Sequence, residues 1–315
     1  MSILRYIGKR LAISVGLLFV ASIIVFMIIH LLPGDPAKII LGNMATDASV
    51  QSLRQELGLH LPLWQQYLDW ITGIFMGNWG ESLVNDKSVL GLMKARYPRS
   101  LQIAVTSMII SLAIAFPLGI VSAFNRDSVL DYVAVFFSQI GVSLPSFWLG
   151  IILILFVAKP LDFLPISGYV SLTEAPVQSM LHTMLPALAL GLINAAIFTR
   201  YLRSELLEEL NKDYVRTARA FGHPRRRIIW KYVLRNAVIP TLTIMGIQFG
   251  YMIGGIVIIE QVFVYPGIGQ LILDGLLSRD YPIVQMGLLL LAATFILANL
   301  IVDVLYGMLD PRVRR

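Results

Sequence analysis

The chain has 315 residues, of which 57% are hydrophobic and 14% are charged, and its mean hydropathy is +0.75. A soluble domain of this size carries roughly 25% charged residues, so the composition predicts a membrane protein. The absence of cysteine excludes disulfides, thiolate metal ligands and cysteine nucleophiles. The formal net charge of +6 comes from basic residues that flank apolar runs, which suits membrane topology better than nucleic-acid binding.

The first apolar run, residues 11–32, follows Arg5, Lys9 and Arg10. It is longer than the roughly 7–15 apolar residues of a signal peptide, and it meets a Pro-Gly-Asp sequence where a cleavage site would have small residues. Its length matches the roughly 20 residues that cross a bilayer. We therefore expect residues 1–33 to form a retained N-terminal transmembrane helix.

Residues 34–97 are mixed and polar, and we expect an extracytoplasmic segment with short amphipathic helices. Asp47 is a candidate N-cap and Gly58 a candidate stop for the first of these helices. Its apolar face would consist of Val50, Leu53 and Leu57. The aromatic-rich stretch 63–76 predicts an aromatic belt at the membrane surface, with a ligand site as the alternative.

Five further apolar runs predict transmembrane helices, at residues 101–124, 132–158, 185–198, 237–259 and 284–305. The second of these runs contains Pro145. The chain is thus predicted to be an all-α membrane protein with six transmembrane helices and both termini on one side. We expect a five-helix core over residues 98–309, with a cytoplasmic loop at 204–236 and a cytoplasmic tail at 310–315.

Lysine and arginine residues set the orientation. With the N-terminus inside, the two short outer loops hold only Lys159 and Arg279, whereas most basic residues lie in the inner segments. The inner set is Arg5, Lys9, Arg10, Arg126, Arg200, Arg203, Lys212, Arg216, Arg219, Arg225, Arg226, Arg227, Lys231, Arg235, Arg312, Arg314 and Arg315. The positive-inside rule therefore predicts an N-in, C-in topology.

Residues 213–240, here called the basic segment, form the long charged stretch between the fourth and fifth runs. Tyr214, Ala218 and Phe221 recur at helical spacing and predict a short helix over 214–221. Gly222 stands where a helix end favours a left-handed residue, and Pro224 stands where a second helix would begin. That second helix would carry Ile228, Ile229, Tyr232 and Val233 on one side. The pattern predicts a compact helix–turn–helix outside the bilayer, which either fixes topology only or docks a cytoplasmic partner.

The basic segment resembles the cytoplasmic loop of bacterial ABC importer permeases. That loop has a Glu-Ala-Ala motif, then three residues and a glycine, and a proline further on; Gly222 and Pro240 match the last two. Arg216, Thr217 and Ala218 occupy the Glu-Ala-Ala position, and the spacing to the proline is longer than in the general pattern. The peptide/nickel subfamily shows the sequence version found at residues 214–222.

Other stretches extend this resemblance from residue 32 to residue 312: residues 32–36, 57–63, 77–80, 260–269, 279–282, 299–306 and 309–312. The resemblance implies a type I permease subunit that translocates a small solute, most simply a di- or oligopeptide. Nickel or metal-chelate and glutathione permeases are the alternatives within the family. It implies a second, similar permease subunit, two cytoplasmic ATPase subunits and an extracytoplasmic solute-binding protein as partners in the bilayer. It also implies that Tyr214, Arg216, Thr217, Ala218, Phe221, Gly222 and Pro240 couple the chain to the ATPase.

Candidate path residues lie in the fourth and fifth runs. Gly246, Gly250 and Gly254 recur every four residues and would let another helix backbone approach closely, with a pore lining as the alternative. Polar residues within or near the spans are Asn194, Gln248, Asn299, Glu260 and Asp303. For each, an interhelical or interfacial polar contact is the simpler interpretation, and Asn194, Gln248, Gly250, Gly254 and Glu260 are the candidates for the path.

The sequence offers little for catalysis. It has no Gly-x-x-x-x-Gly-Lys-Ser/Thr motif, no His-Glu-x-x-His motif and no Gly-x-Ser-x-Gly motif, and His30, His60, His182 and His223 lie far apart. We therefore expect no catalytic residue, metal or cofactor in this chain, and no nucleic-acid partner. An ion-coupled secondary carrier remains as a different class, although such carriers usually keep carboxylates within the membrane. A membrane enzyme is a third class.

Overall fold

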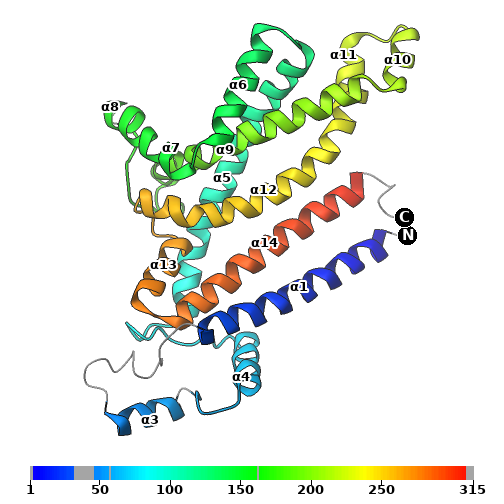
Figure 1. Ribbon diagram of the computed structural model, residues 1–315. Helices are drawn as coiled ribbons and strands as arrows, with labels where there is room; N and C mark the ends of the chain where they lie inside the picture. The colour runs from blue at the N-terminus through cyan, green and yellow to red at the C-terminus, as the bar shows by residue number, and fades with distance from the viewer. Residues whose placement is uncertain (1–2, 32–45, 57, 162, 310–315) are drawn as a thin grey trace. The chain divides into compact units, whose positions relative to one another are not determined.

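The computed structural model describes residues 3–31, 46–56, 58–161 and 163–309. Within these ranges every regular element is a helix, apart from an isolated antiparallel bridge between Glu81 and Ser88 (Figure 1). The family-like stretches at residues 32–36 and 310–312 lie outside the described residues, as do Leu57 and the predicted tail.

The helices follow one another along the chain in the order α1 (Ile3–Leu31), α3 (Asp47–Glu56), α4 (Leu63–Phe75), α5 (Val89–Phe124), α6 (Val129–Ser143), α7 (Ser146–Leu153), η2 (Ile154–Ala158), α8 (Lys159–Leu161), α9 (Pro176–Leu210), α10 (Asp213–Ala220), α11 (Arg225–Arg227), η3 (Ile228–Val233), α12 (Leu234–Val262), α13 (Ile268–Ser278) and α14 (Tyr281–Leu309). The segments η2 and η3 are π-helical.

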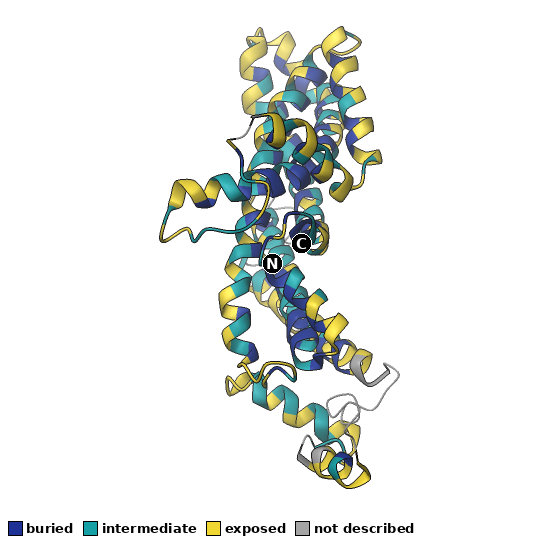
Figure 2. Cartoon of the chain, turned by 90° about the vertical axis from the view of Figure 1, so that its left-hand side faces the viewer, coloured by how far each residue is buried: buried dark blue, intermediate teal, exposed yellow. Residues whose placement is uncertain are grey.

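Five helical stretches of the described residues are long and apolar enough to cross a membrane, and six crossings result if one bent pair counts as a span. The predicted runs 101–124, 185–198, 237–259 and 284–305 each lie inside a longer helix. These helices are longer than predicted because polar residues at their ends continue the backbone hydrogen bonding beyond the apolar stretch. Many apolar side chains are exposed, most of all along α1, and exposed residues occur throughout the chain (Figure 2), as expected for helices that face lipid.

The third predicted span is not one continuous helix. It breaks between α6 and α7 with a bend of 108°, and the apolar run 132–158 completes the six predicted spans when this bent pair counts as one. Leu144 adopts an extended conformation (φ −91, ψ 133) immediately before Pro145, because the proline ring disfavours helical geometry in the residue that precedes it. The proline then starts α7 at its N-cap.

The described part of residues 34–97 contains two complete helices, α3 and α4, and the beginning of α5, which starts at Val89, before the predicted boundary at residue 98. Thr46, rather than the predicted Asp47, caps α3: the Thr46 backbone N–H donates to Ser49 Oγ over 2.9 Å, and the Ser49 N–H donates to Thr46 Oγ1 over 3.2 Å. Asp47 instead lies in the first turn, where its charge favours the helix N-terminus. The predicted stop at Gly58 is confirmed by its φ of +66.

The aromatic residues of α4 pack on α1. The Tyr67 ring lies edge-on to Phe26 with centroids 5.4 Å apart, and the hydroxyls of Tyr67 and Ser22 are 2.8 Å apart. Trp70 also lies against Phe26, at 5.9 Å. Trp64 remains 65% exposed. Part of the predicted aromatic belt therefore serves helix packing.

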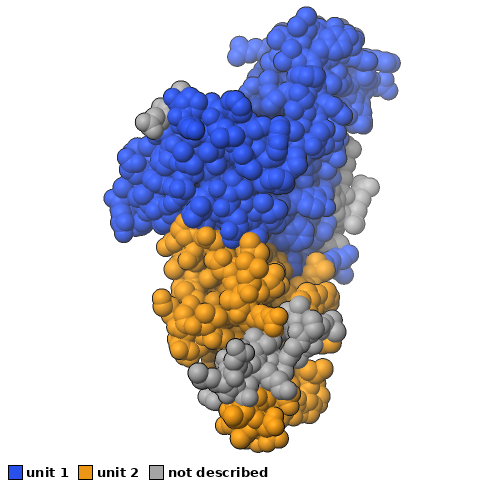
Figure 3. Space-filling view, turned by 60° about the vertical axis from the view of Figure 1, so that its left-hand side comes forward, with its two compact units in different colours: residues 1–14, 100–265, 294–315 blue, residues 15–99, 266–293 orange. Residues whose placement is uncertain are grey.

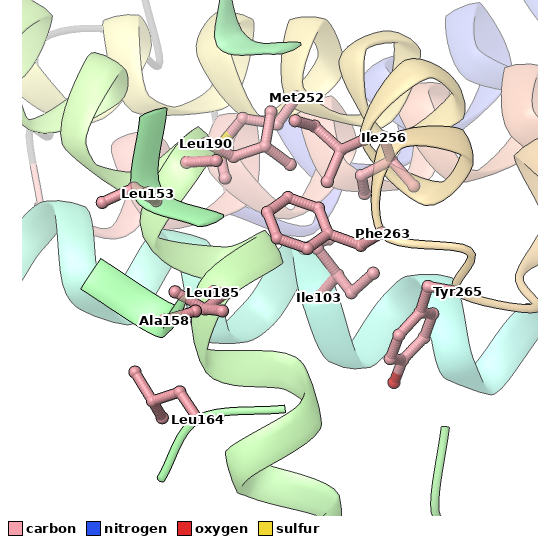
Figure 4. Close-up of a cluster of buried hydrophobic side chains, with 13 residues drawn as sticks. Ile103, Leu153, Ala158, Leu164, Leu185, Leu190, Met252, Ile256, Phe263 and Tyr265 are labelled. Atoms are coloured by element: carbon pink, nitrogen blue, oxygen red, sulfur yellow. The ribbon is translucent and has the colours of Figure 1, made fainter. Parts of the chain in front are cut away.

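The chain divides into two compact units (Figure 3). One comprises residues 1–14, 100–265 and 294–315, and the other comprises residues 15–99 and 266–293. In the first unit, the main apolar core joins α5, α7, α9 and α12, with the Phe263 ring among aliphatic side chains such as Ile103 and Ile256 (Figure 4). In the second, the core includes Met93, Ile272 and Met286.

Small residues allow α6 and α9 to approach closely. A Cβ at Gly141 would lie 2.3 Å from the Cβ of Ala196, which is fully buried in α9. Neither atom can move away without a shift of helix backbone. We therefore expect Gly141→Ala to lower the free energy of unfolding by about 1–3 kcal/mol, as overpacking does, in thermal unfolding of the detergent-purified protein.

The matched control for Gly141→Ala is Gly254→Ala in α12, where a Cβ would meet no heavy atom within 4 Å. Because alanine favours a helix interior over glycine by roughly 0.5–1 kcal/mol, this variant should unfold at or above the wild-type temperature. A Gly141→Ala variant as stable as wild type would mean that α6 and α9 do not meet at this point.

Candidate functional site

The basic segment begins with α10, and the helix end and the turn that follow lie where the sequence predicted them. The first helix spans Asp213–Ala220 against a predicted 214–221. Gly222 has φ +73, the left-handed value that a glycine adopts without strain. Pro224, with φ −63, precedes α11. The predicted turn between two helices is confirmed.

The second helix is not a separate element. From Arg225 to Val262 the chain forms a continuous 38-residue helical stretch through α11, η3 and α12, and α9 reaches Leu210 at the other side. The prediction of a loop over 204–236 with its own second helix was therefore wrong. Pro240 lies inside α12, so it does not end the helix. The segment from Asn211 to His223 therefore links two long helical stretches, α9 and residues 225–262, directly.

The π-helical turn η3 lies in the stretch where the spacing from Gly222 to Pro240 exceeds the general family pattern. A π-turn accommodates extra residues within a helix, and such turns are frequent at functional sites. On the inner side of η3, Ile228 and Val233 are buried, whereas Trp230 is 57% exposed.

The inner face of α10 is fixed by an apolar cluster. Val215 is fully buried and Ala218 is 8% exposed. They share the cluster with Ala123 of α5, Leu202 and Leu206 of α9, and Ile228, Val233 and Ala237 of the following helix. Phe221, predicted to lie on the same face as Tyr214 and Ala218, is 78% exposed. The placement of Phe221 was wrong because α10 ends at Ala220, so the helical spacing does not extend to it.

A buried carboxylate holds α10 in place. Glu209, near the end of α9, is 6% exposed and accepts hydrogen bonds from Lys212 Nζ and the Tyr214 hydroxyl. Asn236 of α12 donates to the same hydroxyl over 3.2 Å. We call Glu209, Lys212, Tyr214 and Asn236 the latch. It joins α9, α10 and α12, and sequence reasoning did not identify Glu209.

The environment of the latch shifts two pKa values. Burial, followed by the hydrogen bond to Glu209, raises the pKa of Tyr214 from 10.0 to about 12. The hydrogen bond to Glu209 also raises the pKa of Lys212. Tyr214 therefore remains a hydrogen-bond donor and Lys212 a cation throughout the physiological pH range.

The outer face of the basic segment is positively charged and exposed. Arg216, Thr217, Arg219 and the three arginines of α11 are exposed, and Arg216 lies 3.7 Å from the exposed Asp213 carboxylate. A cleft of about 510 Å³ opens beside them. Its lining includes Arg219, His223, Arg225, Phe124 and Leu210. This face offers cations and hydrogen-bond donors to an acidic surface.

The candidate path residues do not form one cluster of polar side chains. Asn194 is buried and donates to the Leu190 carbonyl over 2.9 Å, and Asn299 donates to the Phe295 carbonyl over 3.0 Å. Both bonds stay within one helix, and among the residues that the structure describes neither asparagine forms the expected interhelical bond. The short asparagine side chain reaches the carbonyl four residues earlier on its own helix. Gln248 is half-buried in α12.

The glycine stripe of α12 serves packing at two of its three positions. A Cβ at Gly250 would lie 2.0 Å from the Phe295 ring, and one at Gly246 would lie 2.9 Å from Val302, both in α14. Gly254 meets nothing within 4 Å. The stripe therefore brings α12 against α14. Of its three glycines, Gly254 is the one that stays a candidate for lining the translocation path.

Glu260 is fully buried near the end of α12 and accepts a hydrogen bond from Ser100 of α5. Close by in sequence, the Tyr265 hydroxyl lies 3.3 Å from Thr183 Oγ1 of α9, to which Gln102 of α5 donates over 2.9 Å. Polar bonds thus connect α5 to both α9 and the end of α12. For Glu260 the predicted helix–helix polar contact is confirmed.

Asp303, Asp280 and Asp131 each bind partners that are distant in the sequence. Asp303 pairs with Arg10 over 2.9 Å, which confirms the expected helix–helix contact. Asp280 accepts from Ser82 and from the Leu83 N–H. Asp131 binds Arg203 through both carboxylate oxygens. Sequence reasoning missed the last two carboxylates, whose partners are distant in sequence. Within the described ranges, no group of three or more His, Cys, Asp or Glu side chains is placed to hold a metal ion.

Comparison with known proteins gives consistent matches over the whole chain. A family model described as binding-protein-dependent transport system inner membrane component matches residues 115–315, and a model for the N-terminal part of such components matches residues 3–104. A probable peptide ABC transporter permease of Sinorhizobium fredii is 38% identical over 309 residues, 98% of this chain and 99% of that protein. A glutathione transport system permease of Escherichia coli is 38% identical over 311 residues, 99% of each.

A solved structure has the same fold. An inward-facing methionine ABC transporter aligns with a TM-score of 0.56 at 17% identity, over 70% of this chain and 96% of the matched chain.

We expect Tyr214→Phe to loosen α10, because the buried Glu209 loses one donor and an unsatisfied buried polar group costs about 1–3 kcal/mol. Hydrogen exchange should show faster exchange of the α10 amides. Tyr232→Phe is the matched control in the same segment, since its ring, stacked 6.1 Å from His223, is retained. Unchanged α10 protection in Tyr214→Phe would contradict the latch.

The raised pKa of Tyr214 gives the latch a pH limit. Because the pKa of Tyr214 is about 12 in the folded protein against about 10 for an unperturbed tyrosine, its contribution to stability is complete below pH 10 and is lost as the pH rises towards 12. Exchange of the α10 amides should therefore accelerate in this alkaline range in the wild type, relative to Tyr214→Phe.

Proposed function

We propose a transport function from one premise: the chain belongs to the inner membrane components of binding-protein-dependent transport systems. It translocates a di- or oligopeptide, and ATPases docked on the basic segment drive this transport. The chain is a multi-pass permease subunit of an ABC importer in the bacterial inner membrane, and it works in a complex with partner subunits. The family consists of transport subunits rather than enzymes.

The peptide is favoured by the Sinorhizobium fredii relative, whose name specifies peptides. Glutathione, the substrate named for the Escherichia coli relative, is the second candidate and is itself a small peptide. Nickel or metal chelates remain a third. In all three cases the partners would be a second, similar permease, two cytoplasmic ATPase subunits and an extracytoplasmic binding protein that delivers the solute.

The observation that carries the docking proposal is the contrast between the two faces of the basic segment. Its inner face is tied to α9 and α12 by the latch and the apolar cluster. Its outer face presents Arg216, Thr217, Phe221 and Gly222 to the solvent. The distribution of lysine and arginine orients this face towards the cytoplasm, where an ATPase can reach it.

The mechanism that fits this arrangement is mechanical. ATP binding would close the ATPase dimer and move the docked α10. Because the latch joins α10 to α9 and α12, the two long helices would move with it and change the access to the path between permease subunits. Hydrolysis would then reset the cycle. The chain contributes no ATP-binding sequence of its own.

Gly222→Asp tests the docking. Aspartate, like asparagine, tolerates the left-handed φ of +73 at this position, so the change acts through the new carboxylate, which would lie at the tip of the exposed turn. We expect normal insertion and complete loss of ATP-dependent uptake in proteoliposomes containing the full transporter. Gly222→Asn, which tolerates a left-handed conformation and adds no charge, should retain more uptake. Wild-type uptake by a correctly inserted Gly222→Asp variant would refute the docking role.

The solute and the class of transporter are tested with the same proteoliposomes. We expect ATP-dependent uptake of a labelled dipeptide supplied with the cognate binding protein, and weaker uptake of glutathione or a nickel chelate. Uptake by this chain alone under an ion gradient, without ATPases, would identify a secondary carrier instead. Turnover of the solute without transport would identify a membrane enzyme.

A further inference from the structure

A buried ion pair joins α6 to α9. Arg203 Nε donates to Asp131 Oδ1 and its terminal nitrogen donates to Oδ2, each over 2.7 Å. Asp131 is 3% exposed, and Arg203 keeps 24% of its side chain accessible. A bidentate pair of this kind fixes the relative orientation of the two groups as well as their distance.

The same carboxylate receives two further hydrogen bonds. Ser122 of α5, which is fully buried, donates to Oδ1, and the backbone N–H of Asp127 donates to Oδ2 over 3.0 Å. Asp131 is therefore held by α5, by the α5–α6 turn and by α9 at once. Because replacing a buried ion pair by apolar residues is often neutral or stabilising, stability alone is a weak reason for such an arrangement, and orientation of the helices is a better one.

The pair lies next to the elements that hold the basic segment. Leu202, the neighbour of Arg203, and Ala123, the neighbour of Ser122, belong to the apolar cluster beneath α10. Arg203 precedes the end of α9 at Leu210 by about two helical turns. A movement of α10 therefore reaches the ion pair through packed side chains.

From the ion pair, contacts continue along α6 and α7. Further along these helices, Gly141 of α6 meets Ala196 of α9. Beyond the bend, Gly150 of α7 lies against Phe263 and Val262 at the end of α12. The α6–α7 pair thus runs from the end of the bundle next to the basic segment to the end that contains Glu260.

We propose that Asp131 and Arg203 are positioning residues that make α6 move with α9, so that motion of the basic segment reaches α7 and the far end of α12. The proposal rests on the proposed function, because it assigns a route to the motion that docked ATPases would supply. Without the pair, α9 would still move but α6 would not follow it faithfully.

The first test uses the complete transporter, with its partner permease, ATPases and binding protein, in proteoliposomes. Asp131→Asn should assemble and hydrolyse ATP, whereas solute transported per ATP should fall by about tenfold, within the range for packed coupling networks. Arg203→Lys, which keeps the charge but not the two-pronged geometry, should fall less. Wild-type transport per ATP in Asp131→Asn, or a parallel loss of hydrolysis and transport, would overturn the proposal.

Asp127→Asn is the matched control. The Asp127 side chain is 75% exposed and pairs with the exposed Arg126 over 3.5 Å, and only its backbone N–H contacts Asp131. Asparagine also tolerates its left-handed φ of 62. The control should therefore transport normally.

The second test measures directly whether α6 and α9 move together; we call their contact through Asp131 and Arg203 the α6–α9 joint. It does not depend on the stability of a variant that lacks one of these charges. The chain has no cysteine, so spin labels can be placed on Val129→Cys in α6 and Ser204→Cys in α9, both exposed positions. The distance between the labels should be the same in the nucleotide-free and ATP-trapped transporter. A change of more than about 2 Å, the scale of functional helix shifts, would show that α6 and α9 move independently.

The docking of ATPases on the basic segment and the positioning role of Asp131 and Arg203 can be refuted independently. Normal uptake by Gly222→Asp would remove the docking role, whereas the label distance reports on the α6–α9 joint alone. A constant distance together with a loss of transport per ATP in Asp131→Asn supports the proposal.

Discussion

The hydrogen bonds of Glu209 are the interaction on which the basic segment depends. Helix α10 has eight residues, and an isolated helix shorter than roughly 12–15 residues is marginal in water. Its shape must therefore come from contacts with its neighbours, and these are the buried cluster around Val215 and the carboxylate of Glu209. Because Glu209 is in α9 and Asn236 is in α12, the short helix is held by the two long helices that it would have to move.

The sequence predicted those features that follow from the geometry of single residues. Gly222 and Pro224 mark the turn because their backbone preferences are intrinsic. The same reasoning, applied to Pro145, would have predicted the break that divides the third apolar run. The family resemblance predicted the fold and the transport role. The resemblance also identified the basic segment, whose outer face is exposed, as the candidate site for coupling to an ATPase.

Partners distant along the chain could not be predicted in this way. Asp131 and Arg203 are 72 positions apart, and the local sequence around either residue gives no indication that it binds the other. Arg203 was counted only among the inner basic residues that set the membrane topology, although it binds a carboxylate. The path residues illustrate the opposite case: a four-residue glycine repeat has the same pattern whether it lines a path or packs on a helix, and only contacts with Phe295 and Val302 separate the two.

The buried carboxylates Asp131, Glu209, Glu260 and Asp280 lie at or near the ends of apolar helices rather than at their middles, and this has a mechanical consequence. Charges near the centre of a bilayer are costly, so the pairs that fix helix orientation gather where α6, α9 and α12 leave the apolar region. Between these ends, α9 and α12 meet through aliphatic and small side chains, which constrain direction only weakly. Fixed contacts at the helix ends, with smoother contacts between them, would let whole helices tilt as units, and the proposed coupling to an ATPase would require motion of this kind.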